Sequence, residues 1–439
     1  MFTPVKRPDG VPDVSGLDAT AAQPADPADV HRKFGSVWFS RTFESLAARN
    51  FRLLWIGMLL SMGGMQMQMV ARGILVYQIT DDAIITGLVA MGFAPTMLTF
   101  SLFGGVLGDK VERRVLIQAG QAANALLAGL IAISILTGSI HWSHLFITSL
   151  AQGALFAFQM PARQAAIPKL VGKDRLSNAI ALNAMAMSLM TLVAPAIGGG
   201  IYALSGPEGV YLVITGMNLV AVVFTSMIPK MYPDPGKAGM SVLQNIRAGF
   251  AYIWSRPLVR LLLIQGIVVA LLSMPFRMLV QVYATDVYGS GPVGIGLLLA
   301  MAGLGGVAGS MAIASLRRGQ KRGPVLLGSA LLSGVALLSI TMFPFYIVGL
   351  VAMAGIGLGE SGRWALGQSL IMEETSDEFR ARVMSVMMMT FGFMPLGVMP
   401  LSAAMAEFGA RPAVAGMAIL LLVISTLFIL TQPLLRRLP

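Results

Sequence analysis

The sequence has no cysteine, only three histidines and few charged residues of either sign. The absence of cysteine excludes disulfides and thiolate metal sites. Three scattered histidines are too few to form a metal site, so we expect neither a metal nor a cofactor. Charged residues make up 12% of the 439 residues, whereas soluble domains usually carry about 25%. Water is therefore not the main solvent of this chain.

The chain consists largely of long apolar runs, and 56% of its residues are hydrophobic. Runs of about 20 residues recur, and each is long enough to cross about 30 Å of hydrocarbon as a helix. A barrel would instead show alternating strands of about 10 residues, and the sequence has none. The expected fold is an all-α integral membrane protein in a lipid bilayer. Its twelve expected spans are 52–79, 84–108, 115–138, 143–161, 178–204, 209–229, 258–283, 293–316, 323–343, 346–371, 382–406 and 412–433.

The distribution of lysine and arginine predicts the orientation. Nearly all of the 31 basic residues lie in the two tails or in the loops of one side, which explains the net charge of +11 without a nucleic-acid partner. The exceptions are Arg72, Arg277 and Arg363 inside expected spans, and Arg411 in a loop of the other side. Because basic loops stay in the cytoplasm, both termini are expected there. The polar stretch 1–50 has no early apolar core, so we expect a cytoplasmic tail rather than a signal peptide.

The expected organisation is two halves of six helices. A tail at 1–50 precedes a first bundle at 51–229, a cytoplasmic central loop with a surface helix at 230–257, and a second bundle with a short tail at 258–439. Two equal halves suggest an internal duplication. Arg72 lies eight residues before Thr80 and Arg277 lies eight before Thr285, each near the end of the first helix of its half. This local match supports the duplication.

The loop between expected spans 2 and 3 is the most informative charged segment. It contains Gly105, Asp109, Lys110, Arg113 and Arg114 within ten residues. A segment with this many charges cannot lie in hydrocarbon. It must therefore be a short loop in water. One interpretation is a cytoplasmic latch between the two halves, formed in one conformation and broken in the other. The alternative is a loop that only fixes the topology.

Glu360 is the only acidic residue deep within an expected span, and Arg363 follows one helical turn later on the same face. A charge in mid-bilayer costs about 2.5–3.5 kcal/mol on insertion scales and is a functional hypothesis by default. Glu360 is therefore a candidate for proton coupling, with Arg363 keeping it ionised until substrate or movement separates them. The alternative is a structural ion pair that ties this helix to a neighbour.

Further polar residues inside spans are candidates for a substrate cavity. Arg72 shares a helical stripe with Gln68, and Arg277 shares one with Gln281. If they face one cavity, the two arginines would attract an anionic or carbonyl-bearing substrate. The alternatives are snorkelling to the outer interface or a gate contact between helices. The 31 methionines fit either an adaptable apolar pocket or ordinary packing.

Expected span 5 carries a helix-bending motif with Pro195, Gly198 and Gly199. Proline bends a helix and small residues allow close packing between helices. The alternative is the general abundance of proline and glycine in membrane helices.

Several motifs together resemble a known family. The stretch from Gly105 to Arg114 has the spacing of the loop between helices 2 and 3 of the major facilitator superfamily, and the motif around Pro195 resembles its exporter motif in helix 5. The further segments 76–80, 161–168, 379–385 and 395–397 follow in an order similar to the enterobactin-exporter-like branch, the transmembrane secretion effectors. The resemblance runs from about residue 51 to about residue 430. It implies the twelve-helix major facilitator fold and proton-driven efflux of siderophores, drugs or other amphipathic small molecules.

The expected function is secondary active transport by alternating access, with protons as the coupling ion and a small-molecule substrate between the halves. Uptake by symport or facilitated diffusion is the alternative within transport, and a membrane receptor or scaffold is the alternative of another class. No nucleotide-binding Gly-x-x-x-x-Gly-Lys-Ser/Thr motif and no nucleophile triad occurs, so we expect no enzyme. The protein is expected to lie in the bacterial inner membrane. It is expected to be a monomer.

Overall fold

The structure is a computed structural model that describes residues 43–108, 111–172, 175–232, 242–315, 322–376, 379, 382–383, 386–387 and 394–436. The chain divides into two compact units, Met1–Glu44 and Ser45–Pro439, and all helices from α2 onward belong to the second. Asp109 and Lys110 of the predicted latch lie outside the described residues, as does part of the expected span at 382–406.

Every regular element among the described residues is a helix. The 3-10 helices are η1 (Glu44–Ala47) and η2 (Met394–Gly397). The α-helices are α2 (Arg49–Thr80), α3 (Ala83–Met91), α4 (Phe93–Gly108), α5 (Arg113–Leu136), α6 (Trp142–Val171), α7 (Leu176–Ser226), α8 (Val242–Ser255), α9 (Pro257–Met278), α10 (Val280–Tyr288), α11 (Pro292–Ala314), α12 (Arg322–Met342), α13 (Tyr346–Glu374), α15 (Val398–Phe408), α16 (Ala410–Thr431) and α17 (Pro433–Arg436).

Nine helices of the described part are long and apolar enough to cross a membrane, and α7 counts once among them. Its 51 residues would extend about 77 Å as one helix, more than twice the thickness of the hydrocarbon core. The backbone leaves helical geometry at Ser205 and at Gly206, whose φ is 72°, and Pro207 follows. Helix α7 therefore contains two spans, as expected for 178–204 and 209–229.

The turn between α2 and α3 is encoded by two aspartates. Asp81 adopts a left-handed conformation with φ of 48° and ends α2. The Asp82 carboxylate then accepts hydrogen bonds from the backbone N–H groups of Ile84 and Ile85, at 2.6 and 3.2 Å, and caps α3. This turn places α3 beside the end of α2.

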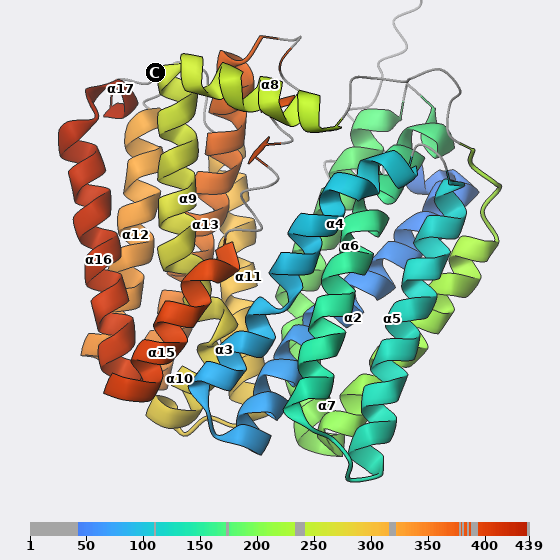
Figure 1. The fold of residues 1–439 in the computed structure, drawn as a ribbon, viewed down its shortest axis with the longest axis horizontal. Coiled ribbons are helices and arrows are strands. Elements are labelled where there is room, and N and C mark those ends of the chain that lie inside the picture. The colour runs from blue at the N-terminus through green and yellow to red at the C-terminus, as the bar shows by residue number, and fades with distance from the viewer. Residues whose placement is uncertain are drawn as a thin grey trace, which may run out of the picture. The chain divides into compact units, whose positions relative to one another are not determined.

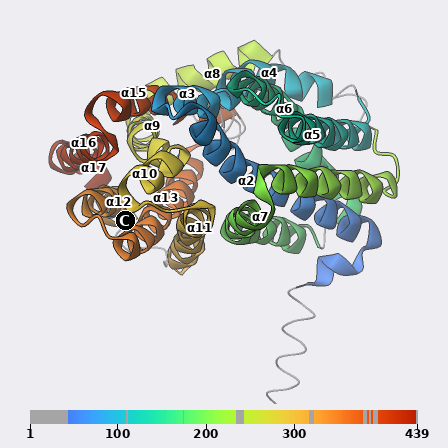
Figure 2. The ribbon, with the colours of Figure 1, turned by 90° about the horizontal axis from the view of Figure 1, so that it is seen from below.

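The helices form two bundles (Figures 1 and 2). In the first, α2 and α5 pack on α7, and α4 packs on α6. In the second, α13 packs on α11, α12 and α9, and α16 packs on α12. Between the bundles, α7 contacts α11, α3 contacts α15 and α2 contacts α10. We call the end where α3, α10 and α15 lie the α10 end, and the opposite end the α8 end (Figure 1).

Glycines bring the two bundles into close contact. A Cβ atom at Gly199 of α7 would overlap the carbonyl oxygen of Pro292 in α11, and one at Gly296 would lie 2.6 Å from the carbonyl oxygen of Pro195. A Cβ at Gly303 would lie 2.7 Å from Cα of Leu192. Backbone atoms cannot move aside as a flexible side chain can. The small residues at these positions are therefore required for the contact between α7 and α11.

The close contact predicts that Gly199→Ala separates the bundles at the α10 end, because the added methyl group meets the Pro292 backbone. Gly200→Ala is the matched control, since a Cβ at Gly200 meets nothing within 4 Å. Spin labels on Ser139→Cys and Phe343→Cys, both in loops at this end, would report the separation by pulsed EPR. The chain has no native cysteine to label. Identical distance distributions in the two glycine variants would contradict the steric argument.

Candidate functional site

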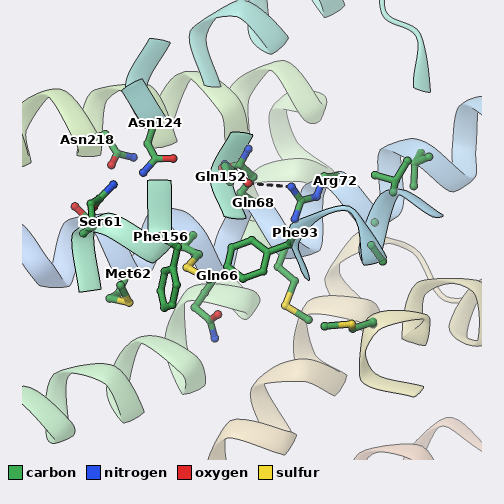
Figure 3. Close-up of a pocket in the computed structure, with 18 of the residues that line it drawn as sticks. Ser61, Met62, Gln66, Gln68, Arg72, Phe93, Asn124, Gln152, Phe156 and Asn218 are labelled. Atoms are coloured by element: carbon green, nitrogen blue, oxygen red, sulfur yellow. Dashed lines mark hydrogen bonds between the residues drawn. The ribbon is translucent and has the colours of Figure 1, made fainter. Parts of the chain in front are cut away.

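The first cavity lies among α2, α3, α4, α5, α6 and α7 and has a volume of about 180 Å³ (Figure 3). Two residues near the start of the second half, Met278 and Gln281, complete its wall. Amide side chains are abundant in the wall: Gln66, Gln68, Asn124, Gln152, Gln159, Asn218 and Gln281. The cavity therefore offers many hydrogen-bond donors and acceptors to a bound molecule.

Apolar side chains provide the rest of the wall of the first cavity. Met62, Met65 and Met69 line it from α2, which fits the interpretation of the abundant methionines as an adaptable apolar pocket. Phe93 and Phe156 line it from α4 and α6, and their rings meet edge to face with centroids 5.5 Å apart (Figure 3). Together with the amides, these side chains make the cavity amphipathic, which is typical of small-molecule sites.

Arg72 is held in the first cavity by two glutamines. Its Nη1 donates to Oε1 of Gln152 at 2.9 Å, and Nε2 of Gln152 donates to Oε1 of Gln68 at 2.5 Å (Figure 3). Gln68 and Arg72 lie on one face of α2, because residues four positions apart are neighbours on a helix. The guanidinium group thus has a polar partner inside the bundle, Gln152, which carries no negative charge.

Arg163 is a functional candidate that the sequence does not predict, because the expected fourth span ends at residue 161 and Arg163 falls in the loop that follows it. Helix α6 instead continues through Pro161 and Pro168 to Val171. Arg163 is 5% exposed and lines the first cavity. The signal was a stripe of Gln152, Phe156, Gln159 and Arg163, whose spacing keeps them on one helical face.

The second cavity lies between α9 and α13 and has a volume of about 300 Å³. Arg277, Glu360 and Arg363 all line it. The Arg277 Nη1 atom lies 2.9 Å from Oε2 of Glu360, and the Ser273 hydroxyl donates to Oε1 at 2.8 Å. Glu360 therefore pairs with an arginine of a neighbouring helix rather than with Arg363 of its own helix.

The six predicted cavity residues fall into two groups. The first cavity contains Gln68, Arg72 and Gln281, and the second contains Arg277, Glu360 and Arg363. Arg72 and Arg277 therefore do not line the same cavity, in contrast to the expectation of one shared cavity. Gln281 also marks a contact between the bundles, because a Cβ at Gly73 of α2 would lie 2.8 Å from Cδ of Gln281.

The described part of the predicted latch is bound within the first bundle. Gly105 belongs to α4. Arg113 donates to the carbonyl oxygen of Ala165 at 3.1 Å, and Arg114 donates to that of Ile228 at 2.6 Å. The two arginines thus tie the start of α5 to the ends of α6 and α7. The predicted contact of Asp109 with the other half lies outside the described residues.

The motif of expected span 5 lies where helices come close together. Pro195 and Gly199 face α11 of the other bundle, as described above, and a Cβ at Gly198 would lie 3.2 Å from Cα of Met67 in α2. The two glycines therefore serve two different interfaces, one within the first bundle and one between the bundles.

The ion pair predicts a large coupling in a double-mutant cycle of Arg277→Met and Glu360→Gln. Removing one member of a buried pair costs roughly 3–5 kcal/mol because the other charge is left without compensation. Arg277 is 19% exposed, so we expect losses at the lower end of this range. The double variant should unfold at a higher temperature than additive losses imply. The matched control is Arg322→Met with Glu373→Gln, a pair whose glutamate is 46% exposed, where we expect near-additive, small effects. Additive losses at Arg277 and Glu360 would contradict the pairing.

Comparison with known proteins supplies the family. Residues 40–436 match the model of the family described as transmembrane secretion effector. The enterobactin exporter EntS of Shigella boydii serotype 4 (strain Sb227) is 23% identical over 335 residues, which cover 76% of this chain and 79% of that protein. EntS of Escherichia coli O139:H28 (strain E24377A / ETEC) shows the same identity and coverage.

Solved transporter structures share the fold. A transporter of the POT family in complex with 5-aminolevulinic acid has a TM-score of 0.72 at 12% identity and covers 89% of this chain and 97% of its own. An inward-facing, unoccupied bacterial homologue of the human lysosomal transporter Spinster has a TM-score of 0.70 at 14% identity, with coverages of 89% and 98%. The nucleoside transporter NupG has a TM-score of 0.69 at 14% identity, with coverages of 87% and 99%. With the helical architecture and the match along nearly the whole chain, this multi-pass membrane protein belongs to the transmembrane secretion effector family of the major facilitator superfamily of transporters.

Proposed function

We propose that this transporter exports an amphipathic small molecule in exchange for protons, by alternating access. The observation that carries the proposal is the buried Glu360–Arg277 pair at the wall of a cavity. Glu360 is the only buried carboxylate among the described residues. A side chain that gains and loses one proton inside the bundle is what proton coupling needs, and intramembrane acids are typical of proton relays.

The orientation gives the two ends of the bundle their roles. With basic loops in the cytoplasm, the α8 end and both termini face the cytoplasm of a bacterial cell, and the α10 end faces outward across the inner membrane. The contacts of α7 with α11, of α3 with α15 and of α2 with α10 then describe a state that is closed toward the outside. In this state the first cavity is the binding site for a substrate from the cytoplasm.

In the proposed exchange cycle, the ion pair between Glu360 and Arg277 belongs to the step after Glu360 has released its proton. In the outward-closed state Glu360 accepts hydrogen bonds from Arg277 and Ser273, and an ion pair with Arg277 needs the carboxylate without its proton. When the bundles open outward, a proton from outside would neutralise Glu360 and release Arg277. Proton and substrate would then compete because each favours a different state, as linkage requires.

The direction of transport rests on the first cavity and on the relatives. A cavity of methionine, phenylalanine and amide side chains suits substrates with a large apolar body and a few polar groups. The relatives named as enterobactin exporters support export rather than uptake. The transporter is proposed to work as a monomer, because the two bundles of one chain together contain both cavities.

The proposed coupling predicts that Glu360→Gln abolishes transport driven by a pH gradient in proteoliposomes but leaves exchange without a gradient intact. The amide keeps the shape of the side chain and cannot take up and release a proton. A ligand found by its thermal stabilisation of the purified protein serves as the substrate. Glu373→Gln, a surface glutamate paired with Arg322, is the control and should transport normally. Proton-driven flux in Glu360→Gln equal to that of the unmodified protein would contradict the coupling role.

A second prediction concerns the latch that the sequence motif around Asp109 suggests. Asp109→Asn is expected to slow turnover several-fold while leaving ligand affinity nearly unchanged, because a latch stabilises one conformation rather than the ligand. Glu112→Gln is the matched control from the same loop, since Glu112 faces Arg114 of its own bundle at 3.8 Å. The measurements are substrate flux and ligand-binding affinity in the same preparations. A turnover of Asp109→Asn equal to that of the control would argue against a latch.

A further inference from the structure

Arg163 is a buried charge with little compensation. Its Nη2 donates to Oε1 of Gln159 at 3.2 Å, whereas Nε and Nη1 are buried and have no hydrogen-bond partner. Such a group costs free energy unless it is paired. No aspartate or glutamate is among the described residues that line the first cavity. The described wall of the cavity therefore carries two guanidinium groups, Arg72 and Arg163, without a carboxylate to balance them.

The two arginines lie far apart along this cavity. Arg72 is bound to Gln152, which lies on the same helix as Arg163 and eleven positions before it. At 1.5 Å per residue, this spacing is about 16 Å along α6. Phe156 lies between them on the same face and also lines the cavity. An apolar section thus separates two cationic ends.

The position of Arg163 is fixed by close packing of α5 and α6. A Cβ atom at Gly120 in α5 would overlap the side chain of Gln159. Gln159 is therefore packed directly against the α5 backbone, and its single hydrogen bond to Arg163 orients the guanidinium group. A guanidinium held in this way keeps donors without a partner at Nε and Nη1, and an anionic group can accept charge-assisted hydrogen bonds from them.

We propose that Arg163 is a binding residue for the anionic group of the substrate, so that the transported molecules are amphipathic organic anions. This inference rests on the proposed function and specifies its substrate class. A carboxylate or sulfonate would pair with the free nitrogen atoms of Arg163, and the apolar body would lie along Phe156 and the methionines of α2. An organic cation would meet two positive charges in a region of low dielectric, which opposes its binding.

The test compares three probes with one apolar body: phenylbutyrate as the anion, phenylbutyramide as the neutral analogue and phenylbutylamine as the cation. Binding to the purified full chain is measured by calorimetry and by thermal stabilisation. We expect the anion to bind at least about tenfold more tightly than the amide, the size of one charge-assisted hydrogen bond, and the amine to bind most weakly. Arg163→Gln should remove the preference for the anion and leave the affinity for the amide unchanged. Arg163→Lys should keep only part of it, because lysine lacks the planar fork.

Two controls separate this proposal from the proposal of transport. Arg322→Gln removes an arginine that pairs with Glu373 outside both cavities and should leave all three affinities unchanged. Equal affinity of the unmodified protein for the anion and the amide would overturn the anion site, and this comparison holds even if an Arg163 variant does not fold. A preference for the anion that survives Arg163→Gln would overturn it as well. Selective anion binding without any proton-driven flux would contradict the transport proposal alone, whereas equal flux of amide and anion would contradict the anion site alone.

Discussion

The burial of charge within a bundle surrounded by hydrocarbon is the constraint on which this structure depends. Each ionised side chain that leaves the loops needs a partner, because the surrounding lipid offers none. Arg277 has Glu360, Arg72 has the amide of Gln152, and Arg163 has only Gln159. Among these three arginines, compensation is greatest at Arg277, which has a full ion pair, whereas Arg72 and Arg163 each have a single amide. That difference matches the proposed roles of proton site and substrate site, because an ion pair can be broken by one proton and an unpaired cation can be completed by an anion.

Close helix contacts supply the second requirement of a transporter, which is a closed end that can open. The α7–α11 interface relies on glycine and backbone atoms, and a hydrogen bond of 2.6 Å from the Tyr77 hydroxyl to Asp286 joins the bundles at the α10 end. Contacts of this kind are either formed or absent, because packed interfaces do not deform continuously. A proton or a substrate that favours one arrangement can therefore shift the whole bundle between two states.

Much of the architecture was predictable from the sequence, because the length and the hydrophobicity of a segment identify a membrane helix. The kink of α7 at Gly206, Glu360 as a buried acid and Gln68 with Arg72 in a cavity follow from patterns within single helices. The partner of Glu360 and the division of the polar residues between two cavities depend on how different helices pack, which the periodicity of one helix does not contain. Arg163 is not predicted for another reason: the expected span ends at Pro161, although prolines are tolerated inside membrane helices.

The separation of the two cavities means that proton and substrate influence each other through the state of the bundle. Direct electrostatics would act in the opposite sense, because an anion near Glu360 would favour its protonated form. The most direct measurement is therefore the change in pH when phenylbutyrate, adjusted to the same pH, is added to the purified protein in weak buffer. Exchange through two states predicts proton release by the unmodified protein and none by Glu360→Gln. Proton uptake on binding would contradict exchange and would indicate symport instead.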